Sequence, residues 1–349
     1  MTPARPAAPL LAVEGLTVRL ETDSGPVYAL DDVSLDLQAG EVLAVVGESG
    51  CGKSMLALSI LGLLPTNGRV VSGQVCLGGT NLLRLAARDL RKVRGKQVGM
   101  VFQEPMTSLN PVFTVGQQVA EVVRQHEGLD ASAARTRTLE ILNRVELPAP
   151  ERRVDEYPHQ LSGGMAQRVM IAMAIACNPR LLIADEPTTA LDVTIQAAIL
   201  RLLLDLRDRL GMGIILITHD LGVVADVADR VAVLYAGRKV ETARVHDLFA
   251  APQHPYTVGL LGAVRYPGKT RLDRLGGRRL REIPGLVPTR REPAANCVFA
   301  PRCARADDRC HTSLPQLEPH RREVASHLAA CFHPGPESDM AAPVAAEHA

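Results

Sequence analysis

The alternation of hydrophobic and polar positions divides most of the chain into short strands and longer helices. Along residues 10–20 and 27–37, apolar and polar positions alternate, which is the pattern of strands with one buried face. Three short, mostly apolar runs predict buried strands: 41–46, 181–184 and 213–218. Four longer segments are typical of helices: 55–64, 132–146, 163–177 and 194–210. Strands and helices that alternate in this way predict an α/β fold around a largely parallel sheet.

The C-terminal part differs in composition from the rest. Residues 264–294 are rich in Arg, Pro and Gly, which predicts few long helices or strands there. Ala, Pro and Glu dominate the end of the chain, and we expect residues 336–349 to form a disordered tail. No internal repeat is visible. We therefore expect one large α/β unit over residues 10–250 and a small irregular extension over residues 251–335.

Composition and charge narrow the class of protein. Hydrophobic residues make up 46% of the chain and charged residues 22%, as in ordinary globular proteins. The 39 Lys and Arg residues balance 38 Asp and Glu residues, which disfavours a broad basic surface for nucleic acid. The longest apolar stretch, residues 55–64, is too short for a membrane-spanning helix, which needs about 20 residues. The N-terminus lacks the features of a signal peptide. We expect a cytoplasmic chain whose membrane contact comes through a partner.

A glycine-rich loop, GESGCGKS, separates a predicted strand from a predicted helix. It fits the phosphate-binding pattern G-x-x-x-x-G-K-[ST], and its members are Gly47, Glu48, Ser49, Gly50, Cys51, Gly52, Lys53 and Ser54. Glycines let backbone N–H groups turn toward phosphate oxygens, and the helix N-terminus adds a favourable partial charge. We expect Lys53 to reach the β- and γ-phosphates and Ser54 to bind Mg²⁺. The alternative is a glycine-rich turn that matches by chance, which the strand–loop–helix context disfavours.

Two carboxylates follow the buried run LLIADE. A strand that delivers side chains at its C-terminal end places them where ligand sites form in α/β sheets. Asp185 is expected to hold Mg²⁺ through water, and Glu186 to act as the general base for an attacking water. Alone, the pair is equally well explained as two solvated acids at a strand end.

The run LSGGMAQR, residues 161–168, precedes LLIADE by about one helix. Ser162, Gly163 and Gly164 would begin that helix, so a hydroxyl and bare backbone amides point off its N-terminus. This predicts a second anion site in a chain that already has one.

Together with the runs DEPTTALD and LITHD, these motifs resemble the nucleotide-binding subunits of ABC transporters in order and spacing, over residues 10–250. The resemblance implies an ATPase that binds ATP and Mg²⁺. It also implies a P-loop NTPase cassette with a RecA-like core, an antiparallel β-subdomain and a helical subdomain.

The resemblance assigns roles to three further residues. Gln103, in VFQEP, matches the Q-loop glutamine, which senses Mg²⁺ and water and links the site to the membrane partner. Asp192, in TALD, matches the D-loop, and His219, in LITHD, matches the switch histidine that contacts the γ-phosphate. Outside this context His219 would be interpreted as a structural histidine. The family further implies a head-to-tail dimer in which the signature of one cassette covers the ATP held by the other.

The chain departs from the family at the position that stacks on adenine. The family usually has an aromatic residue near the first strand, where this chain has Leu20. Tyr28 lies nearby and would substitute for it. The alternative is that Tyr28 packs within the β-subdomain.

Four further segments resemble the ATPases of oligopeptide, dipeptide and nickel importers: 104–118, 184–200, 254–257 and 283–288. The resemblance extends over residues 10–335. It implies peptide import, with nickel or another small solute as the alternative cargo. The implied partners are an external solute-binding protein, two integral membrane permease subunits and a second, paralogous ATPase subunit. The implied location is peripheral, on the cytoplasmic face of the inner membrane.

Four cysteines lie close together in the extension: Cys297, Cys303, Cys310 and Cys331. Four thiolates can hold a [4Fe–4S] cluster or a tetrahedral zinc ion. Paired C-x-x-C motifs, which structural zinc sites prefer, are absent here, and the resemblance to peptide-importer ATPases favours the iron–sulfur cluster. Zinc and four ordinary thiols remain the alternatives.

Two other functions fit the motifs less well. An ABC protein that acts on ribosomes or DNA usually carries two cassettes or a long coiled coil, for which the interval between Lys53 and Ser162 leaves no room. A P-loop kinase would lack both the LSGG run and His219.

Overall fold

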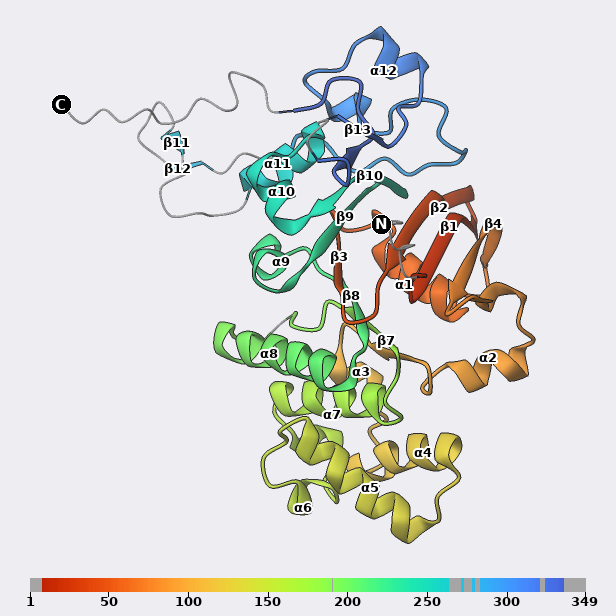
Figure 1. The fold of residues 1–349 in the computed structure, drawn as a ribbon, viewed down its shortest axis with the longest axis vertical. Helices are drawn as coiled ribbons and strands as arrows, with labels where there is room; N and C mark the ends of the chain where they lie inside the picture. The colour runs from red at the N-terminus through yellow and green to blue at the C-terminus, as the bar shows by residue number, and fades with distance from the viewer. Residues whose placement is uncertain are drawn as a thin grey trace, which may run out of the picture.

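The computed structural model is built on one long mixed sheet (Figure 1). The structure describes the following parts of the chain: residues 8–189, 191–263, 271–272, 278–279, 283–320 and 324–335. The sheet order is β13-β14-β10-β9-β3-β8-β7-β6. Its parallel strands are β3 (Val42–Val46), β6 (Val98–Val101), β7 (Leu181–Asp185), β8 (Gly213–Ile217) and β9 (Arg230–Tyr235). The three predicted buried strands are therefore confirmed, and they pair with one another at the centre of the sheet.

A second, antiparallel sheet lies beside helix α1 (Lys53–Leu61). Its order is β2-β1-β4-β5, and its strands are β1 (Leu11–Thr22), β2 (Gly25–Leu37), β4 (Gly68–Leu77) and β5 (Thr80–Asn81). The two alternating segments predicted from the sequence are β1 and β2, which pair along their whole length. The antiparallel subdomain is thus confirmed.

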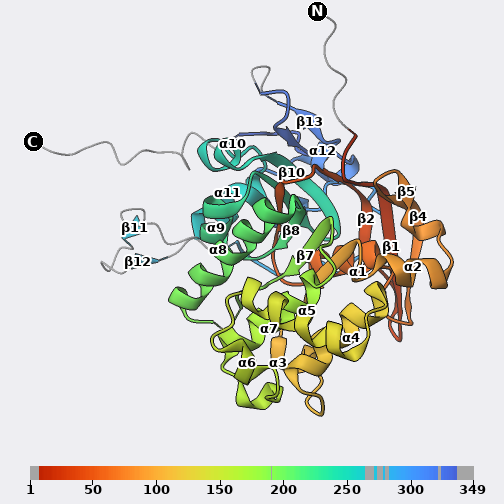
Figure 2. The ribbon, with the colours of Figure 1, turned by 60° about the horizontal axis from the view of Figure 1, so that its bottom comes forward.

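Helices between β6 and β7 gather at one end of the molecule (Figures 1 and 2). They are α3 (Pro105–Ser108), α4 (Val115–Glu127), α5 (Ala131–Arg144), α6 (Pro150–Arg153) and α7 (Gly163–Ile175). Helix α4 was not predicted from the hydrophobic pattern. A local signal for it exists, because Thr114 and Gln117 form a capping box at its start.

The remaining helices of the α/β unit connect or flank the strands. They are α2 (Ala87–Val93), the 3₁₀ turns η1 (Leu82–Arg84) and η2 (Pro158–Gln160), α8 (Val193–Leu210) and α9 (Leu221–Val227). Helix α8 begins where Asp192 accepts a hydrogen bond from the Ile195 N–H, and it ends at Gly211 in the left-handed conformation.

From residue 238 onward, through the end of the predicted α/β unit and the C-terminal extension, the elements are short. They are β10 (Arg238–Arg244), α10 (Val245–Ala250), α11 (Pro255–Ala263), β11 (Arg271–Leu272), β12 (Arg278–Arg279), η3 (Ala300–Arg302), α12 (Asp308–Thr312), β13 (Glu318–Pro319) and β14 (Leu328–Ala329). Strand β14 pairs with β10, so the extension continues the sheet. The predicted tail over residues 336–349 lies outside the described residues, as does most of 264–282.

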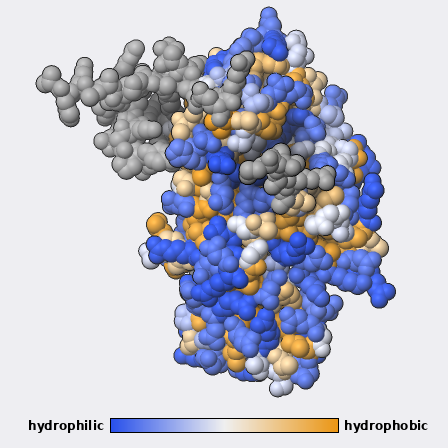
Figure 3. Space-filling model, viewed as in Figure 1, coloured by the Kyte–Doolittle hydropathy of each residue, from blue (hydrophilic) through white to orange (hydrophobic). Residues whose placement is uncertain are grey.

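Two hydrophobic clusters form the core. One lies between the antiparallel sheet, α1 and one face of the long sheet, and the other covers the opposite face and reaches into the extension through Val298 and Phe299. On the face drawn in Figure 3, hydrophobic positions form small patches interrupted by hydrophilic ones. Within the described part of the chain, every helix is too short or too polar to cross a membrane.

Candidate nucleotide-binding and hydrolysis site

The glycine-rich loop turns sharply between β3 and α1, and two of its glycines are sterically required. Gly47 has φ +154° and Gly52 has φ +108°. A Cβ atom on Gly47 would lie 2.2 Å from the Leu234 carbonyl oxygen, and one on Gly52 would lie 2.5 Å from that of Ala29. Such approaches exclude any side chain, so the loop can follow this path only with glycine at both positions.

Lys53 closes this loop on itself. Its side chain is 6% exposed, and its Nζ donates to the carbonyl oxygens of Gly47 (2.8 Å) and Glu48 (3.0 Å). The ammonium group therefore lies within the turn of the loop, where a phosphate group would meet it together with the backbone amides.

Asp185, the last residue of β7, is buried near Ser54. Burial raises the pKa of its carboxyl, and a hydrogen bond with the Ser54 side chain opposes this shift. Its Oδ1 atom is buried and has no hydrogen-bond partner. An unpaired carboxylate oxygen beside a serine hydroxyl is a donor set that suits Mg²⁺ and its bound waters.

Glu186 brings two of the predicted residues together. Its carboxylate accepts a hydrogen bond from Gln103 Nε2 at 3.1 Å and lies 3.2 Å from His219 Nδ1. Thr189, which sequence reasoning missed, also donates to it at 2.9 Å. Gln103, Glu186 and His219 follow the adjacent parallel strands β6, β7 and β8, so the sheet order itself gathers them at one edge.

A pocket of about 430 Å³ lies next to these groups. Lining residues that were predicted to bind nucleotide are Ser49, Gly50, Gly52, Lys53, Ser54, Gln103 and Glu186. Tyr28, the candidate for the base contact, lines it as well, as does Leu20, which occupies the position where the family usually has an aromatic residue. One wall was not anticipated: residues 287–290 come from the C-terminal extension, where the Arg290 carbonyl accepts a hydrogen bond from the Tyr28 N–H at 2.8 Å.

The signature residues lie away from this pocket. Ser162 caps α7, accepting from the Met165 N–H at 3.4 Å, and it is exposed together with Gly163. Gly164 is buried, and a Cβ there would lie 2.8 Å from Ile195. Asp192 is exposed at the start of α8. None of these residues lines the pocket beside the phosphate loop, so the second candidate anion site is separate from the first.

The four predicted cluster cysteines occupy one part of the extension. Cys297 and Cys310 are buried and joined by a backbone hydrogen bond of 3.1 Å, while Cys303 and Cys331 are half-buried. Backbone N–H groups donate to two of the sulfurs, Arg305 to Cys303 (3.4 Å) and His333 to Cys331 (3.3 Å). Burial raises the pKa of Cys331 to about 12, and the neighbouring thiols of Cys297 and Cys303 add to this shift.

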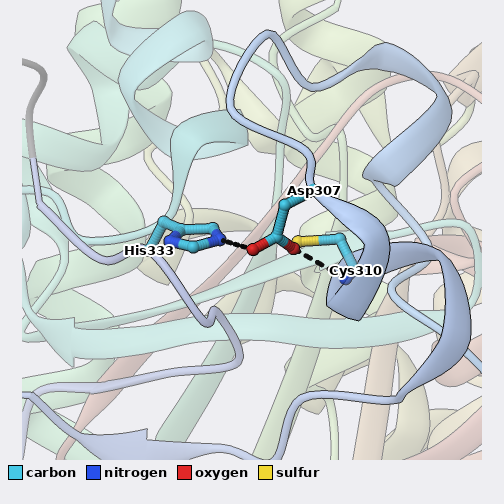
Figure 4. A group of neighbouring side chains, drawn as sticks. All are labelled: Asp307, Cys310 and His333. Carbon is cyan, nitrogen blue, oxygen red and sulfur yellow. Dashed lines mark hydrogen bonds and ion pairs between the residues drawn. The ribbon is translucent and has the colours of Figure 1, made fainter.

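A second set of ligand-type side chains adjoins Cys310. Asp307 lies between Cys310 and His333, accepting from the Cys310 N–H (3.0 Å) and from His333 Nε2 (2.9 Å) (Figure 4). The ligand atoms of these three residues lie within 4.8 Å of one another, and among the described residues no three of the cysteine sulfurs do. A closed tetrahedral zinc site would need its sulfurs about 3.8 Å apart. The arrangement is therefore unlike a preformed four-cysteine zinc site.

Comparison with known proteins places this geometry in a family. Residues 30–189 match the ABC transporter family, and residues 240–310 match the C-terminal region of oligopeptide/dipeptide transporters. A probable peptide ABC transporter ATP-binding protein of Sinorhizobium fredii is 52% identical over 93% of this chain and 94% of that protein. The chain belongs to the ABC transporter ATP-binding proteins. It is accordingly an ABC-type ATPase.

Two further similarities refine the assignment. The dipeptide transport ATP-binding protein DppD of Escherichia coli is 48% identical over 88% of this chain and 92% of that protein. Among solved structures, a dimeric ATP-binding cassette bound to ADP and Pi in a post-hydrolysis state matches with a TM-score of 0.61 and 31% identity. The match includes 67% of this chain and 98% of the solved cassette. The cassette fold therefore extends over two thirds of this chain, and the extension lies largely beyond it.

Proposed function

We propose that this chain is the ATP-hydrolysing subunit that powers import of di- or oligopeptides through an ABC transporter. The observation that carries the hydrolytic role is the contact of Glu186 with both Gln103 and His219 beside the phosphate loop. Similarity over nearly the whole chain to a peptide and a dipeptide transport protein supports the cargo class.

In the proposed reaction, Glu186 takes a proton from the water that attacks the γ-phosphate. Gln103 and His219 hold its carboxylate from two sides, which fixes the direction in which it meets the water. Lys53 turns from the loop carbonyl oxygens to the phosphate oxygens, exchanging neutral acceptors for charged ones.

Mg²⁺ would be held by Ser54, Asp185 and Gln103. When bound, it neutralises the phosphate charge that develops in the transition state. The unpaired Oδ1 of Asp185 supports this assignment, because a buried acceptor without a partner is costly unless a ligand or water satisfies it.

The separation of the signature from the pocket supports a head-to-tail dimer. Ser162 and Gly163 are exposed and do not line the pocket beside the phosphate loop, so they would be free to cover the ATP of a second cassette. Asp192, exposed at the start of α8, would lie at the same junction. We propose that the second cassette is a paralogous subunit.

An exposed apolar surface next to Gln103 supports contact with membrane subunits. Its residues are Phe102, Met106, Val112 and Phe113. Several large apolar side chains that are exposed within one short segment are typical of a protein interface, and this segment begins at the hydrolytic site. We propose that two permease subunits bind here, which places the chain peripherally on the cytoplasmic face of the inner membrane. An external solute-binding protein would deliver the peptide.

We propose further that Cys297, Cys303, Cys310 and Cys331 hold a [4Fe–4S] cluster. Backbone N–H groups that donate to Cys303 and Cys331 are suited to thiolate ligands, whose charge they stabilise. The absence of close sulfur triplets among the described residues disfavours zinc. Iron analysis and visible absorbance near 400 nm of protein purified without oxygen test this, and protein without iron would refute it.

The decisive experiment measures ATP hydrolysis by the reconstituted transporter with its solute-binding protein. We expect peptides to stimulate turnover. Stimulation by Ni²⁺ alone would keep the motor and replace the cargo, and a complex that hydrolyses no ATP under either condition would refute the proposed function.

A further inference from the structure

The second residue of the phosphate loop, Glu48, is held from two sides by the C-terminal extension. Its backbone N–H donates to the Tyr256 hydroxyl oxygen at 2.8 Å. Its carboxylate accepts two hydrogen bonds from Arg302 Nη1, at 3.0 and 3.2 Å. Tyr256 belongs to α11 and Arg302 to η3, so both partners lie more than 200 residues away in sequence.

Arg302 also holds the opposite wall of the pocket. Its Nη2 donates to the Ile283 carbonyl oxygen at 3.0 Å, and its Nε donates to that of Pro284 at 2.7 Å. These two residues begin the segment whose continuation, 287–290, lines the nucleotide pocket. One guanidinium therefore joins the phosphate loop to the pocket wall supplied by the extension.

Burial and several contacts hold the Arg302 side chain in one position. Its side chain is only 5% exposed, and it lies 5.7 Å from the centre of the Tyr235 ring. Tyr235, Tyr256 and Phe299 pack together, with ring centres 4.7 to 5.5 Å apart. Planar, multidentate hydrogen bonding by a buried guanidinium is directional, and lysine cannot reproduce it. Such a group fixes the distance between the parts it joins.

We propose that Arg302 and Tyr256 are positioning residues for ATP binding: they hold Glu48 and the 283–290 segment so that the phosphate loop and the pocket wall are preorganised for the nucleotide. Neither touches the reacting atoms. The inference rests on the proposed ATPase function. It predicts that loss of either contact weakens ATP binding, because part of the binding free energy must then order the loop. Turnover at saturating ATP should change little, because the bound phosphates would restore the loop conformation.

The test compares Arg302→Met and Arg302→Lys with wild type in the assembled transporter. We expect Arg302→Met to raise the KM for ATP, and the Kd for a fluorescent ATP analogue, about tenfold, with kcat at saturating ATP within about twofold. Arg302→Lys should lie between wild type and Arg302→Met, because an ammonium can reach Glu48 but cannot bond both carbonyl oxygens as well. A fall in kcat without a rise in KM would overturn the proposal.

Arg305→Met is the matched control. Arg305 lies in the same segment, and in the described part of the chain its side-chain hydrogen bonds go to the carbonyl oxygens of His333, Pro334 and Gly335 and not to the phosphate loop. If Arg305→Met raises the KM as much as Arg302→Met does, general loosening of the extension is the cause and the proposal is wrong.

A double-mutant cycle tests the pair directly. If Arg302 acts through Glu48, Glu48→Ala combined with Arg302→Ala should raise the Kd little more than Arg302→Ala alone, and additive effects would contradict this. Should the Arg302 variants fail to fold, Tyr256→Phe removes only the hydroxyl that accepts the Glu48 N–H, and we expect about a threefold rise in Kd. An unchanged Kd would overturn the proposal. If wild type binds and hydrolyses ATP while the variants match it, this inference fails and the proposed function stands.

Discussion

Two regions of the molecule place their candidate functional residues in different ways. The strand ends of the long sheet carry Gln103, Glu186 and His219, which follow three adjacent parallel strands. The four cysteines instead lie within residues 297–331, where the longest described element is the five-residue helix α12. Backbone hydrogen bonds of the sheet bring the first group together. Buried polar side chains hold the second region: Glu241, fully buried in β10, accepts from Gln253 N–H, His254 N–H and His327 Nε2 at 2.7 to 2.9 Å. The candidate catalytic residues thus lie at strand ends of the sheet, whereas the extension is held by buried polar contacts together with the apolar packing of Val298 and Phe299.

The largest expected effect is in the strand-end group. Glu186→Gln should lower ATP turnover by about 100-fold or more, because the amide cannot accept the proton of the attacking water. ATP binding should persist, since the residue does not belong to the phosphate loop. Steady-state hydrolysis and nucleotide titration measure the two. Glu121→Gln is the control, because this exposed glutamate on α4 belongs neither to the candidate site nor to the proposed permease surface, and its loss should leave turnover near wild type.

In β10, where the extension is joined to the long sheet, the corresponding variant should lower the free energy of unfolding and not the rate of turnover. Glu241→Ala leaves three buried donors without their acceptor and should lower the free energy of unfolding by about 3–5 kcal/mol. Urea unfolding of the nucleotide-free chain measures it. Glu318→Ala, an exposed glutamate on β13, should change stability by less than about 0.5 kcal/mol. Equal effects of the two variants would contradict the difference between the regions.

The same region should respond to acid. Burial lowers the pKa of His254 to about 4, and its Nδ1 accepts from the Tyr256 N–H at 3.1 Å, so the folded ring is neutral. The unfolded ring protonates near pH 6.5, so between about pH 6.5 and 4 the unfolded state binds more protons. The neutral His254 ring therefore contributes about 3 kcal/mol to the free energy of unfolding above pH 6.5, and this contribution is lost as the pH falls to about 4. His254→Asn should make the free energy of unfolding, measured by urea unfolding at several pH values, depend less on pH between about 6.5 and 4. His246→Asn, at an exposed position, should leave that dependence unchanged.

The smallest effect concerns the boundary between the two regions, where Tyr28 meets Arg290. If the Tyr28 ring stacks on adenine, Tyr28→Leu should weaken ATP binding about fivefold. Its N–H bond to the Arg290 carbonyl oxygen is a backbone contact and would survive the substitution. Nucleotide titration measures the change, with Tyr157→Leu as the control in the helical subdomain. An unchanged affinity would mean that Tyr28 contributes packing only.

Most of the α/β unit could be predicted from the sequence. The apolar runs of β3, β7 and β8 and the loop at residues 47–54 are local patterns, in which period and residue type dictate the element. Positions of Gln103, Glu186 and His219 could be predicted because each follows a recognisable motif. Helix α4 and the hydrogen bond of Thr189 to Glu186 were missed, since the first lies in a segment of mixed composition and the second depends on a tight turn after β7.

By itself, the sequence determined which residues are the candidates for the chemistry, because phosphate loops and strand-end carboxylates need particular residue types at fixed local spacing. Only the tertiary structure decided that the extension reaches the nucleotide pocket. The bonds from Arg302 and Tyr256 to Glu48 span more than 200 residues, and an arginine in a Pro- and Arg-rich segment has no local pattern that identifies its partner. Contacts of this kind depend on how the extension packs against the rest of the fold. The folding of the whole chain, and not the spacing of residues along it, brings Arg302 and Tyr256 within hydrogen-bond distance of Glu48.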